Sequence, residues 1–231
     1  MFINCYKALN QISRMKVLEL FAGSRSIGKV ADERGHTTFS VDIKPFDGIN
    51  VVKDCEFITI DDLPFIPDAL FAGTPCTTYS LAAISHHRNE DRTPKTEFAA
   101  KCDRMNVNLL KLISDILKVN KDFVWYIENP RAVLRKMDFM RGLPRVTVWY
   151  CKYGDIAAKP TDWWSNNLYS IFNPKGWQPR EECFNGNTKC HHDSAPRGSK
   201  TGTQGKKSNY ERSKYPRELC VELIKSIEQH G

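Results

Sequence analysis

The sequence predicts a mostly parallel α/β fold. Short apolar runs alternate with helical segments along most of the chain, and the first run ends in the turn Ala22-Gly23-Ser24. This alternation is typical of parallel sheets whose faces are covered by the connecting helices. The expected strands cover residues 17–21, 37–43, 49–52, 69–72, 124–127 and 146–150.

Three helices are expected to cover this sheet. The clearest spans residues 98–118, where apolar side chains recur every three or four positions and so form one buried face. A shorter helix at 26–34 is stopped by Gly35. A C-terminal helix shows the same apolar face at Leu219, Leu223 and Ile227.

Regular structure is hard to predict between residues 159 and 213, where Trp, Pro, Gly and Asn dominate. We therefore expect three parts: a core at 1–166, a small basic and irregular region at 167–212, and a C-terminal helix at 213–231 that packs back on the core. The first 14 residues precede the pattern and have no assigned role.

Charge is distributed unevenly along the chain. The net charge is +7, but the span 131–217 holds 17 Lys/Arg against 7 Asp/Glu. A basic half of this kind indicates a polyanionic partner, although a solvated basic surface without a ligand gives the same pattern.

The cellular setting is predicted from what the sequence contains. No apolar run is long enough to span a bilayer, and the N-terminus lacks the apolar core of a signal peptide. The eight cysteines are therefore expected to be free thiols, and we expect a cytoplasmic protein with no membrane partner.

Three motifs stand at predicted strand ends, in a fixed order. They are FAGSRSIG at 21–28, PCTTYS at 75–80 and IENP at 127–130. Together they resemble the motifs FxGxG, PCxxxS and ENV or ENP of the DNA cytosine-5 methyltransferases, over about residues 15–165. The small phage-encoded enzymes are the most similar subgroup. The resemblance implies a Rossmann-like S-adenosylmethionine-dependent methyltransferase fold, with a small irregular C-terminal region that faces DNA.

Cys76 and Glu128 are the predicted catalytic pair. A thiolate that adds to C6 of cytosine breaks the aromaticity of the ring, so that C5 can attack an electrophilic methyl group. A carboxyl group near N3 neutralises the charge that develops in this step. The alternatives are a buried hydrophobic role for Cys76 and an exposed strand-end charge for Glu128.

The resemblance also implies a cofactor site for S-adenosylmethionine. The glycine turn lets backbone approach the methionine end, and an acidic residue at the end of the second strand binds the ribose hydroxyls. Asp54 is the weakest assignment, because a loop aspartate often caps a helix instead. The expected cofactor residues are Phe21, Gly23, Asp42, Ile43, Asp54 and Pro75.

The sequence departs from the family pattern in three places. Arg25 stands where the second glycine of FxGxG is expected. In the motif YGxPQxRxR, Ala157 replaces the glutamine, and Lys159 and Thr161 replace the arginines, which leaves the handling of the target base open. The target-recognition region is also short and lacks the late GNS signature, so we expect short or relaxed sequence specificity.

Nucleic-acid contacts are expected from three regions. The polar stretch 81–96 is interpreted as a loop that closes over the flipped base, and Arg131 follows the IENP motif. The basic, glycine-rich stretch 195–207 suits a phosphate backbone, although a disordered surface loop has the same composition. The expected contact residues are Ser80, Arg88, Arg131, Lys159, Arg197 and Lys200.

A structural zinc site is a further hypothesis. Cys183, Cys190 and His191, with Cys151 about thirty residues upstream, provide four ligands for a tetrahedral ion. His192 is an alternative to His191, and unrelated thiols are the alternative to a metal site, because no CxxC pair is present.

The predicted function is methyl transfer from S-adenosylmethionine to C5 of cytosine in double-stranded DNA, with the target base flipped out. RNA is not excluded, because a tRNA cytosine-5 methyltransferase uses the same chemistry. A catalytically weak DNA-binding regulator or decoy is the other alternative. A phage-encoded enzyme would act in the host cytoplasm.

Overall fold

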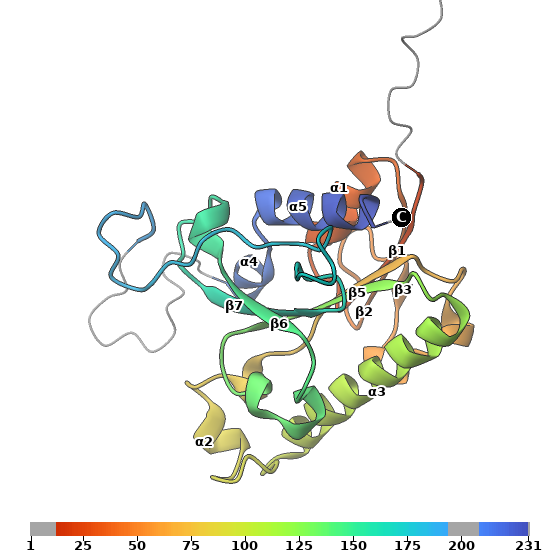
Figure 1. Ribbon diagram of the computed structural model, residues 1–231. Coiled ribbons are helices and arrows are strands. Elements are labelled where there is room, and N and C mark those ends of the chain that lie inside the picture. The colour runs from red at the N-terminus through yellow and green to blue at the C-terminus, as the bar shows by residue number, and fades with distance from the viewer. Residues whose placement is uncertain (1–12, 194–207, 231) are drawn as a thin grey trace, which may run out of the picture.

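The computed structural model describes residues 13–193 and 208–230. It is built around a seven-stranded sheet with the strand order β3-β2-β1-β4-β5-β7-β6 (Figure 1). Every strand runs parallel to the others except β7, which pairs antiparallel with β5 and β6. The strands are β1 (Lys16–Leu20), β2 (Thr37–Asp42), β3 (Val51–Val52), β4 (Ala69–Gly73), β5 (Val124–Pro130), β6 (Arg145–Trp149) and β7 (Pro160–Ser165).

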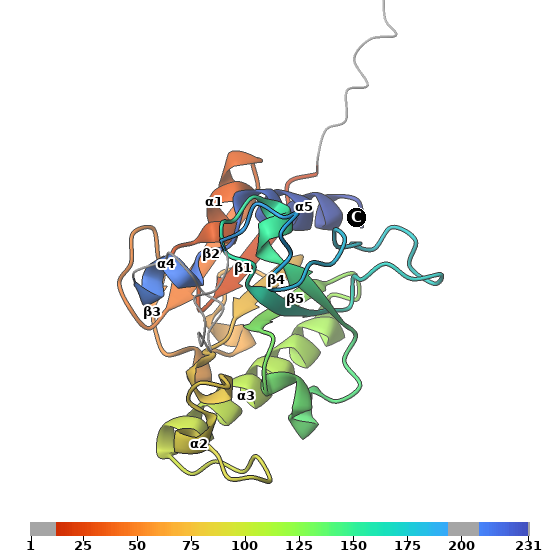
Figure 2. The same ribbon diagram turned by 90° about the vertical axis from the view of Figure 1, so that its left-hand side faces the viewer.

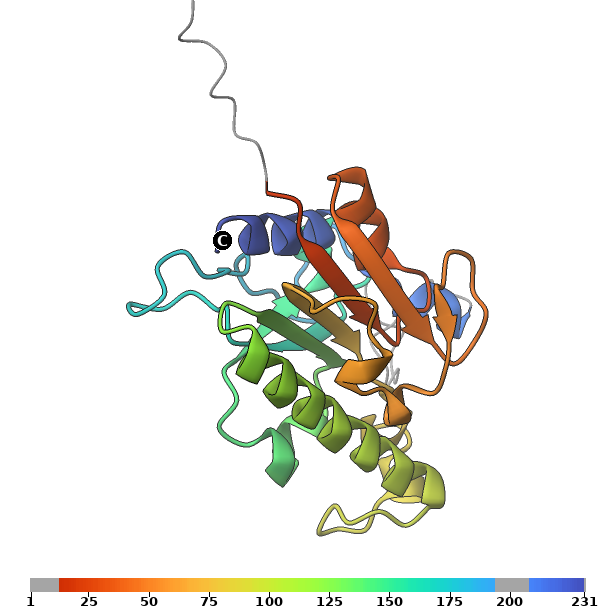
Figure 3. The same cartoon turned by 90° about the vertical axis from the view of Figure 1, so that its right-hand side faces the viewer.

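Two helices cover one face of the sheet and one long helix covers the other, as Figures 1 and 3 show. The α-helices are α1 (Ser26–Glu33), α2 (Ile84–His87), α3 (Glu97–Val119), α4 (Asn209–Ser213) and α5 (Arg217–Glu228). Short 3-10 helices join them at η1 (Cys55–Phe57), η2 (Ile60–Asp62), η3 (Thr77–Tyr79), η4 (Leu134–Lys136), η5 (Asp138–Met140) and η6 (Tyr150–Tyr153).

The core follows from the alternation of side chains along the strands. Val17 packs with α1 and α5, while the next residue, Leu18, packs with α3. Both side chains are fully buried because β1 lies in the middle of the sheet and both its faces are covered. The mostly parallel sheet predicted from the sequence is therefore confirmed.

Strand β7 was not predicted from the sequence. Its segment, PTDWWS, begins with proline and contains an aspartate, which conceals its strand character. Trp163 and Trp164 are fully buried, and the register places Trp163 beside Glu128 of β5. This strand thus forms one wall next to the IENP motif.

The C-terminal part of the chain returns to the core. Helix α5 packs against α1 (Figure 2). Tyr210 of α4 packs on Phe46, which follows β2, with ring centroids 5.4 Å apart. The expected boundaries at residues 166 and 212 stay predictions. Within the described ranges, none of the helices combines the length and apolar character required to cross a bilayer.

Candidate active site

The candidate site lies at the carboxyl ends of the parallel strands, which all meet at one edge of the sheet. Strand β4 ends at Gly73, and Cys76 follows three residues later, exposed to solvent at the start of η3. Gly73 pairs with Glu128 of β5. A Cβ atom at Gly73 would lie 3.5 Å from Oε2 of Glu128 and would collide with the hydroxyl of Tyr215, so glycine is required at this position.

Asn129 joins the turn that carries Cys76 to strand β5. Its Nδ2 donates to the carbonyl of Thr74 at 2.9 Å and to the Thr74 hydroxyl at 3.2 Å. The Thr74 N–H in turn donates to the Glu128 carbonyl at 3.3 Å. The ENP and PC motifs are therefore fixed to each other by hydrogen bonds on buried groups.

The Glu128 carboxyl is buried and is held by two tyrosines. The Tyr150 hydroxyl donates to Oε1 at 3.2 Å, and the Tyr215 hydroxyl donates to Oε2 at 3.3 Å. Burial raises the pKa of Glu128, while the positive charge of Lys159 and the two tyrosines oppose that rise. A raised pKa suits a carboxyl group that must carry or share a proton.

Lys159 lies close enough to act on both catalytic candidates. Its Nζ donates to the carbonyl of Arg212 at 2.7 Å and stands 4.5 Å from the centroid of the Tyr150 ring. The pKa of the Cys76 thiol is raised by the surrounding protein atoms and by the charge of Glu128, and Lys159 lowers it. The charge of Lys159, a residue predicted to contact nucleic acid, thus lowers the pKa of both the thiol and the carboxyl.

The cofactor candidates gather at the ends of β1 and β2. Phe21 and Gly23 both have left-handed backbone, with φ of 54° and 48°. The Gly23 N–H donates to Oδ2 of Asp42 at 2.9 Å, which ties the glycine turn to the end of β2. Ile43 follows with its side chain 55% exposed, so it is free to pack on a flat ligand.

Arg25 occupies the position of the second glycine of FxGxG. It adopts a left-handed backbone with φ of 54°, the conformation that glycine takes without strain. Its guanidinium donates to the hydroxyls of Ser40 and Thr38 and pairs with Asp32. Ser40 and Thr38 lie on β2 before Asp42, and Asp32 lies in α1, so the guanidinium joins these two elements.

Glu19 is a buried acidic residue that sequence reasoning missed. It accepts hydrogen bonds from the Ile27 N–H at 3.2 Å and the Gly28 N–H at 3.0 Å, and so caps the first turn of α1. Burial raises its pKa to about 7. An acidic residue in the middle of the apolar run VLELF was the available signal.

Asp54 and Pro75, the other two predicted cofactor residues, lie at the same edge of the sheet, but their contacts give less support for a cofactor role. Oδ1 of Asp54 accepts the Glu56 N–H, and Oδ2 pairs with Lys101, so Asp54 acts as the cap of η1. Pro75 is half-buried beside Cys76. Their roles toward a cofactor stay predictions.

The predicted nucleic-acid residues are dispersed. Arg131 is exposed at the end of β5, with its guanidinium 5.0 Å from the Trp149 ring centroid. Ser80 is half-buried, and its hydroxyl accepts the Ala82 N–H at 3.3 Å. Arg197 and Lys200 lie outside the described residues.

Arg88 does not fit the predicted contact with nucleic acid. Its side chain is fully buried, forms two hydrogen bonds with the Asp103 carboxylate and stacks 4.3 Å from the Tyr79 ring centroid. It also donates to the carbonyl of Thr78. Arg88 therefore anchors the 81–96 loop to α3, and a DNA phosphate has no access to its guanidinium.

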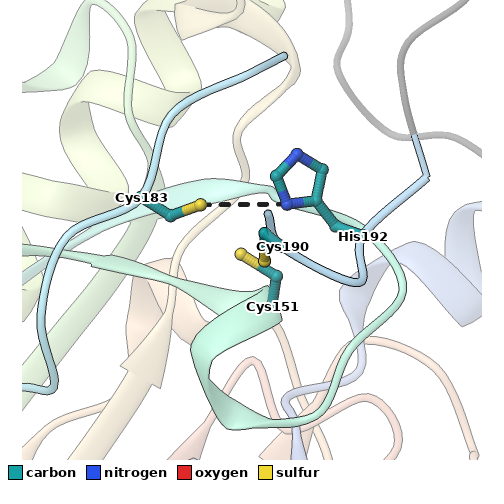
Figure 4. Close-up of side chains that lie close together, drawn as sticks. All are labelled: Cys151, Cys183, Cys190 and His192. Atoms are coloured by element: carbon teal, nitrogen blue, oxygen red, sulfur yellow. Dashed lines mark hydrogen bonds between the residues drawn. The ribbon is translucent and has the colours of Figure 1, made fainter. Parts of the chain in front are cut away.

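The metal hypothesis requires one correction. Cys151, Cys183 and Cys190 come together as predicted, but the nearby histidine is His192 and not His191 (Figure 4). His191 is exposed, and its Nε2 is 3.1 Å from the carbonyl oxygen of Asp155. The chain bends at both histidines, and only His192 has its imidazole beside the thiols.

Two tyrosines and a short segment of the chain lie at this site although the sequence did not predict them there. Tyr150 and Tyr215 reach Glu128 from distant positions, and Ser213 lies near Gly23 across the glycine turn. The Tyr215 N–H also donates to the Ser26 hydroxyl at 3.2 Å. The segment 208–216 therefore crosses the same edge of the sheet as the catalytic candidates.

Comparisons with known proteins add little to this site. No protein-family model and no curated protein matches the sequence. Among solved structures, the chain is similar to the Dnmt2 methyltransferase of S. pombe, with 13% identity, a TM-score of 0.46, and coverage of 66% of this chain and 49% of that one. It is also similar to a DNMT2 mutant from Spodoptera frugiperda, with 16% identity, a TM-score of 0.42, and coverage of 73% and 54%.

The chain spans about half the length of both structures. The similarity is too low to support a functional conclusion, which must rest on the residues of the chain itself.

Proposed function

We propose that this protein transfers a methyl group from S-adenosylmethionine to C5 of cytosine in DNA, with Cys76 as the nucleophile. The observation that supports this most is the pairing of an exposed thiol at the end of β4 with a buried carboxyl, Glu128, on the adjacent strand. Asn129 holds the two segments together.

The reaction follows from these two groups. The Cys76 thiolate bonds to C6 of cytosine, and the electron pair of the C5–C6 double bond becomes available at C5, while Glu128 shares its proton with N3. S-adenosylmethionine would supply an electrophilic methyl group, whose bond to the positively charged sulfur breaks as C5 attacks it, with the electron pair of that bond left on the sulfur. Once C5 carries the methyl group, solvent water takes up the C5 proton, N3 returns its proton to Glu128, and the electron pair of the former C5–H bond re-forms the C5–C6 double bond, which breaks the S–C6 bond and releases the Cys76 thiolate.

The residues at the ends of β1 and β2 fit the proposed cofactor. Asp42 keeps lone pairs for ribose hydroxyls besides the N–H groups of Gly23 and Lys44, which it already accepts. The exposed side chain of Ile43 offers an apolar surface to the adenine. In this proposal Phe21, Gly23 and Pro75 contact the part of the cofactor between that surface and Cys76.

DNA is proposed as the polymer because of the basic half of the chain and the exposed Arg131 next to the ENP motif. We propose that Lys159 favours the ionised forms of Cys76 and Glu128 and does not contact a phosphate. The charge balance itself is equally suited to RNA, so the substrate must be determined directly.

Methyl transfer can be measured with radiolabelled S-adenosylmethionine and either duplex DNA or tRNA. We expect label in DNA with the wild-type chain, none with Cys76→Ser, and a loss of at least a hundredfold with Glu128→Gln, whereas exposed Glu90→Gln keeps full activity. Label in tRNA alone would overturn the DNA assignment. Bound cofactor without any transfer would favour the regulator alternative.

A covalent adduct tests the nucleophile itself. DNA that contains 5-fluorocytosine cannot lose its C5 substituent as a proton, so the Cys76–C6 bond should persist and retard the protein on a denaturing gel. Methyl transfer by the wild type without such an adduct would exclude Cys76 as the nucleophile.

A further inference from the structure

Four side chains of metal-binding type converge beside the carboxyl end of β6. Cys151 comes from η6, directly after β6, and Cys183, Cys190 and His192 come from the irregular segment that follows β7. Their ligand atoms all lie within 4.8 Å of one another, and Figure 4 shows the three sulfur atoms and the imidazole pointing toward a common centre.

The spacing of these atoms suits a tetrahedral ion. Zinc–ligand bonds of about 2.0–2.3 Å place tetrahedral ligand atoms roughly 3.5–3.8 Å apart. Sγ of Cys183 and Nδ1 of His192 are 3.8 Å apart. Only a small contraction would therefore be needed for all four atoms to bind one ion.

The surroundings indicate a closed structural site. Cys151, Cys183 and His192 are buried and Cys190 is half-buried, so four protein ligands fill the coordination shell with no open position for a substrate. Three thiolates and one imidazole form a soft ligand set that favours zinc over magnesium or calcium. The Asn187 side chain also donates an N–H to Sγ of Cys183 at 3.4 Å, the kind of hydrogen bond that supports a metal-bound thiolate.

The segment that carries three of the ligands has little other support. Between residues 182 and 193 the chain forms turns only, and its apolar packing is a small cluster of Trp149, Cys151, Ala158 and Cys183, with Cys190 against it. A few backbone hydrogen bonds, such as Asp193 N–H to the Ile156 carbonyl at 2.8 Å, fix its ends. A cluster this small cannot order such a segment by packing alone.

We propose that Cys151, Cys183, Cys190 and His192 bind one structural zinc ion, which fixes the segment 182–193 to η6. Because Cys151 follows Tyr150 directly, the ion also stabilises the element whose tyrosine holds Glu128. The zinc site stands on its own four ligands and is independent of the proposed methyl transfer.

The metal content of the chain tests this site. The protein is purified without chelator under reducing conditions, and zinc and iron are measured by mass spectrometry. We expect about one zinc per chain in the wild type, a loss of more than tenfold in Cys183→Ser and His192→Ala, and retention in His192→Cys. Two matched controls, His191→Ala and Cys76→Ser, should keep the wild-type zinc content.

A second measurement on the wild-type chain covers the case in which the variants fail to fold. Replacement of zinc by cobalt should produce the visible absorption of a tetrahedral ion and strong sulfur-to-cobalt charge transfer from three thiolates. A folded wild type without stoichiometric zinc, an iron-loaded site, or loss of zinc in His191→Ala but not His192→Ala would each overturn the proposal.

Discussion

The Tyr215 hydroxyl donates a hydrogen bond to Oε2 of Glu128, with 3.3 Å between the oxygens. The two residues are 87 positions apart in the chain, and Tyr215 stands at the end of the segment that leads into α5. Its ring packs edge-on against Trp163 of β7, at 5.3 Å between centroids. The C-terminal segment is thus part of the wall around the Glu128 carboxyl.

Tyr215→Phe should weaken catalysis while the fold is kept. The hydroxyl stabilises the carboxylate form of Glu128, which in the proposed reaction develops as the proton moves to N3, so its loss should raise the pKa of Glu128 and oppose that transfer. We expect kcat to fall about tenfold, with KM little changed, because a hydrogen bond to a charged group contributes roughly 1.5–3 kcal/mol.

The pH profile separates this role from a merely structural one. Protonated Glu128 is lost as pH rises, so the alkaline limb of kcat should move to higher pH in Tyr215→Phe. Tyr169→Phe, which alters an exposed tyrosine, should leave the profile unchanged. Equal alkaline limbs in Tyr215→Phe and the wild type would contradict the assignment.

The reactivity of Cys76 should report on Glu128 and Lys159 without any substrate. The charge of Glu128 raises the pKa of the thiol, and that of Lys159 lowers it. Glu128→Gln should therefore shift the pH dependence of Cys76 alkylation to lower pH, and Lys159→Met should shift it to higher pH. Lys159→Arg, which keeps the charge, serves as the control.

Alkylation is measured with iodoacetamide, and the labelled Cys76 peptide is quantified by mass spectrometry so that other thiols do not interfere. A shift of about half a pH unit or more in opposite directions is expected for the two neutralising variants. The absence of a shift in both variants would show that desolvation alone controls the thiol.

Arg25 should contribute to stability and not to cofactor affinity. Its guanidinium is largely buried among Ser40, Thr38 and Asp32, so Arg25→Gly should lose about 1–3 kcal/mol of unfolding free energy despite the freedom of glycine at a positive φ. Arg25→Ala should lose roughly 1 kcal/mol more, because alanine is strained in that conformation.

Urea unfolding and calorimetric titration with S-adenosylmethionine distinguish the two effects. The cofactor affinity of folded Arg25→Gly should stay within about threefold of the wild type. A large loss of affinity with unchanged stability would place the side chain in the cofactor site.

The sequence was sufficient to predict the parallel strands and the placement of Cys76 and Glu128 at strand ends, because these depend on local apolar runs and on motifs at strand ends. It was insufficient for Tyr150 and Tyr215, since nothing local marks a tyrosine that meets Glu128 only after the chain has folded. The sequence also contained no indication that the Arg88 side chain is buried.

Arg88 was predicted to contact DNA from the charge of its loop, but its position depends on Asp103, a partner in α3. The choice between His191 and His192 depends in the same way on the turn that precedes them. Contacts made across the fold, and the orientation of adjacent side chains, are set by packing and not by the local pattern.

Glu19 should make stability depend on pH between about 4.5 and 7. Its pKa is about 7 in the folded chain against an ordinary value of 4.5, so the folded state binds the proton more tightly than the unfolded state. The resulting stabilisation is fully present below pH 4.5 and is lost as pH rises through 7. The difference between the two pKa values corresponds to about 3 kcal/mol.

The expected result is that the unfolding free energy, measured by urea titration at a series of pH values, falls by about this amount relative to Glu19→Gln, which cannot ionise. Glu90→Gln, an exposed control, should follow the wild type. Parallel curves for wild type and Glu19→Gln would mean that Glu19 is ionised at all these pH values and that the N–H groups of Ile27 and Gly28 compensate fully for its burial.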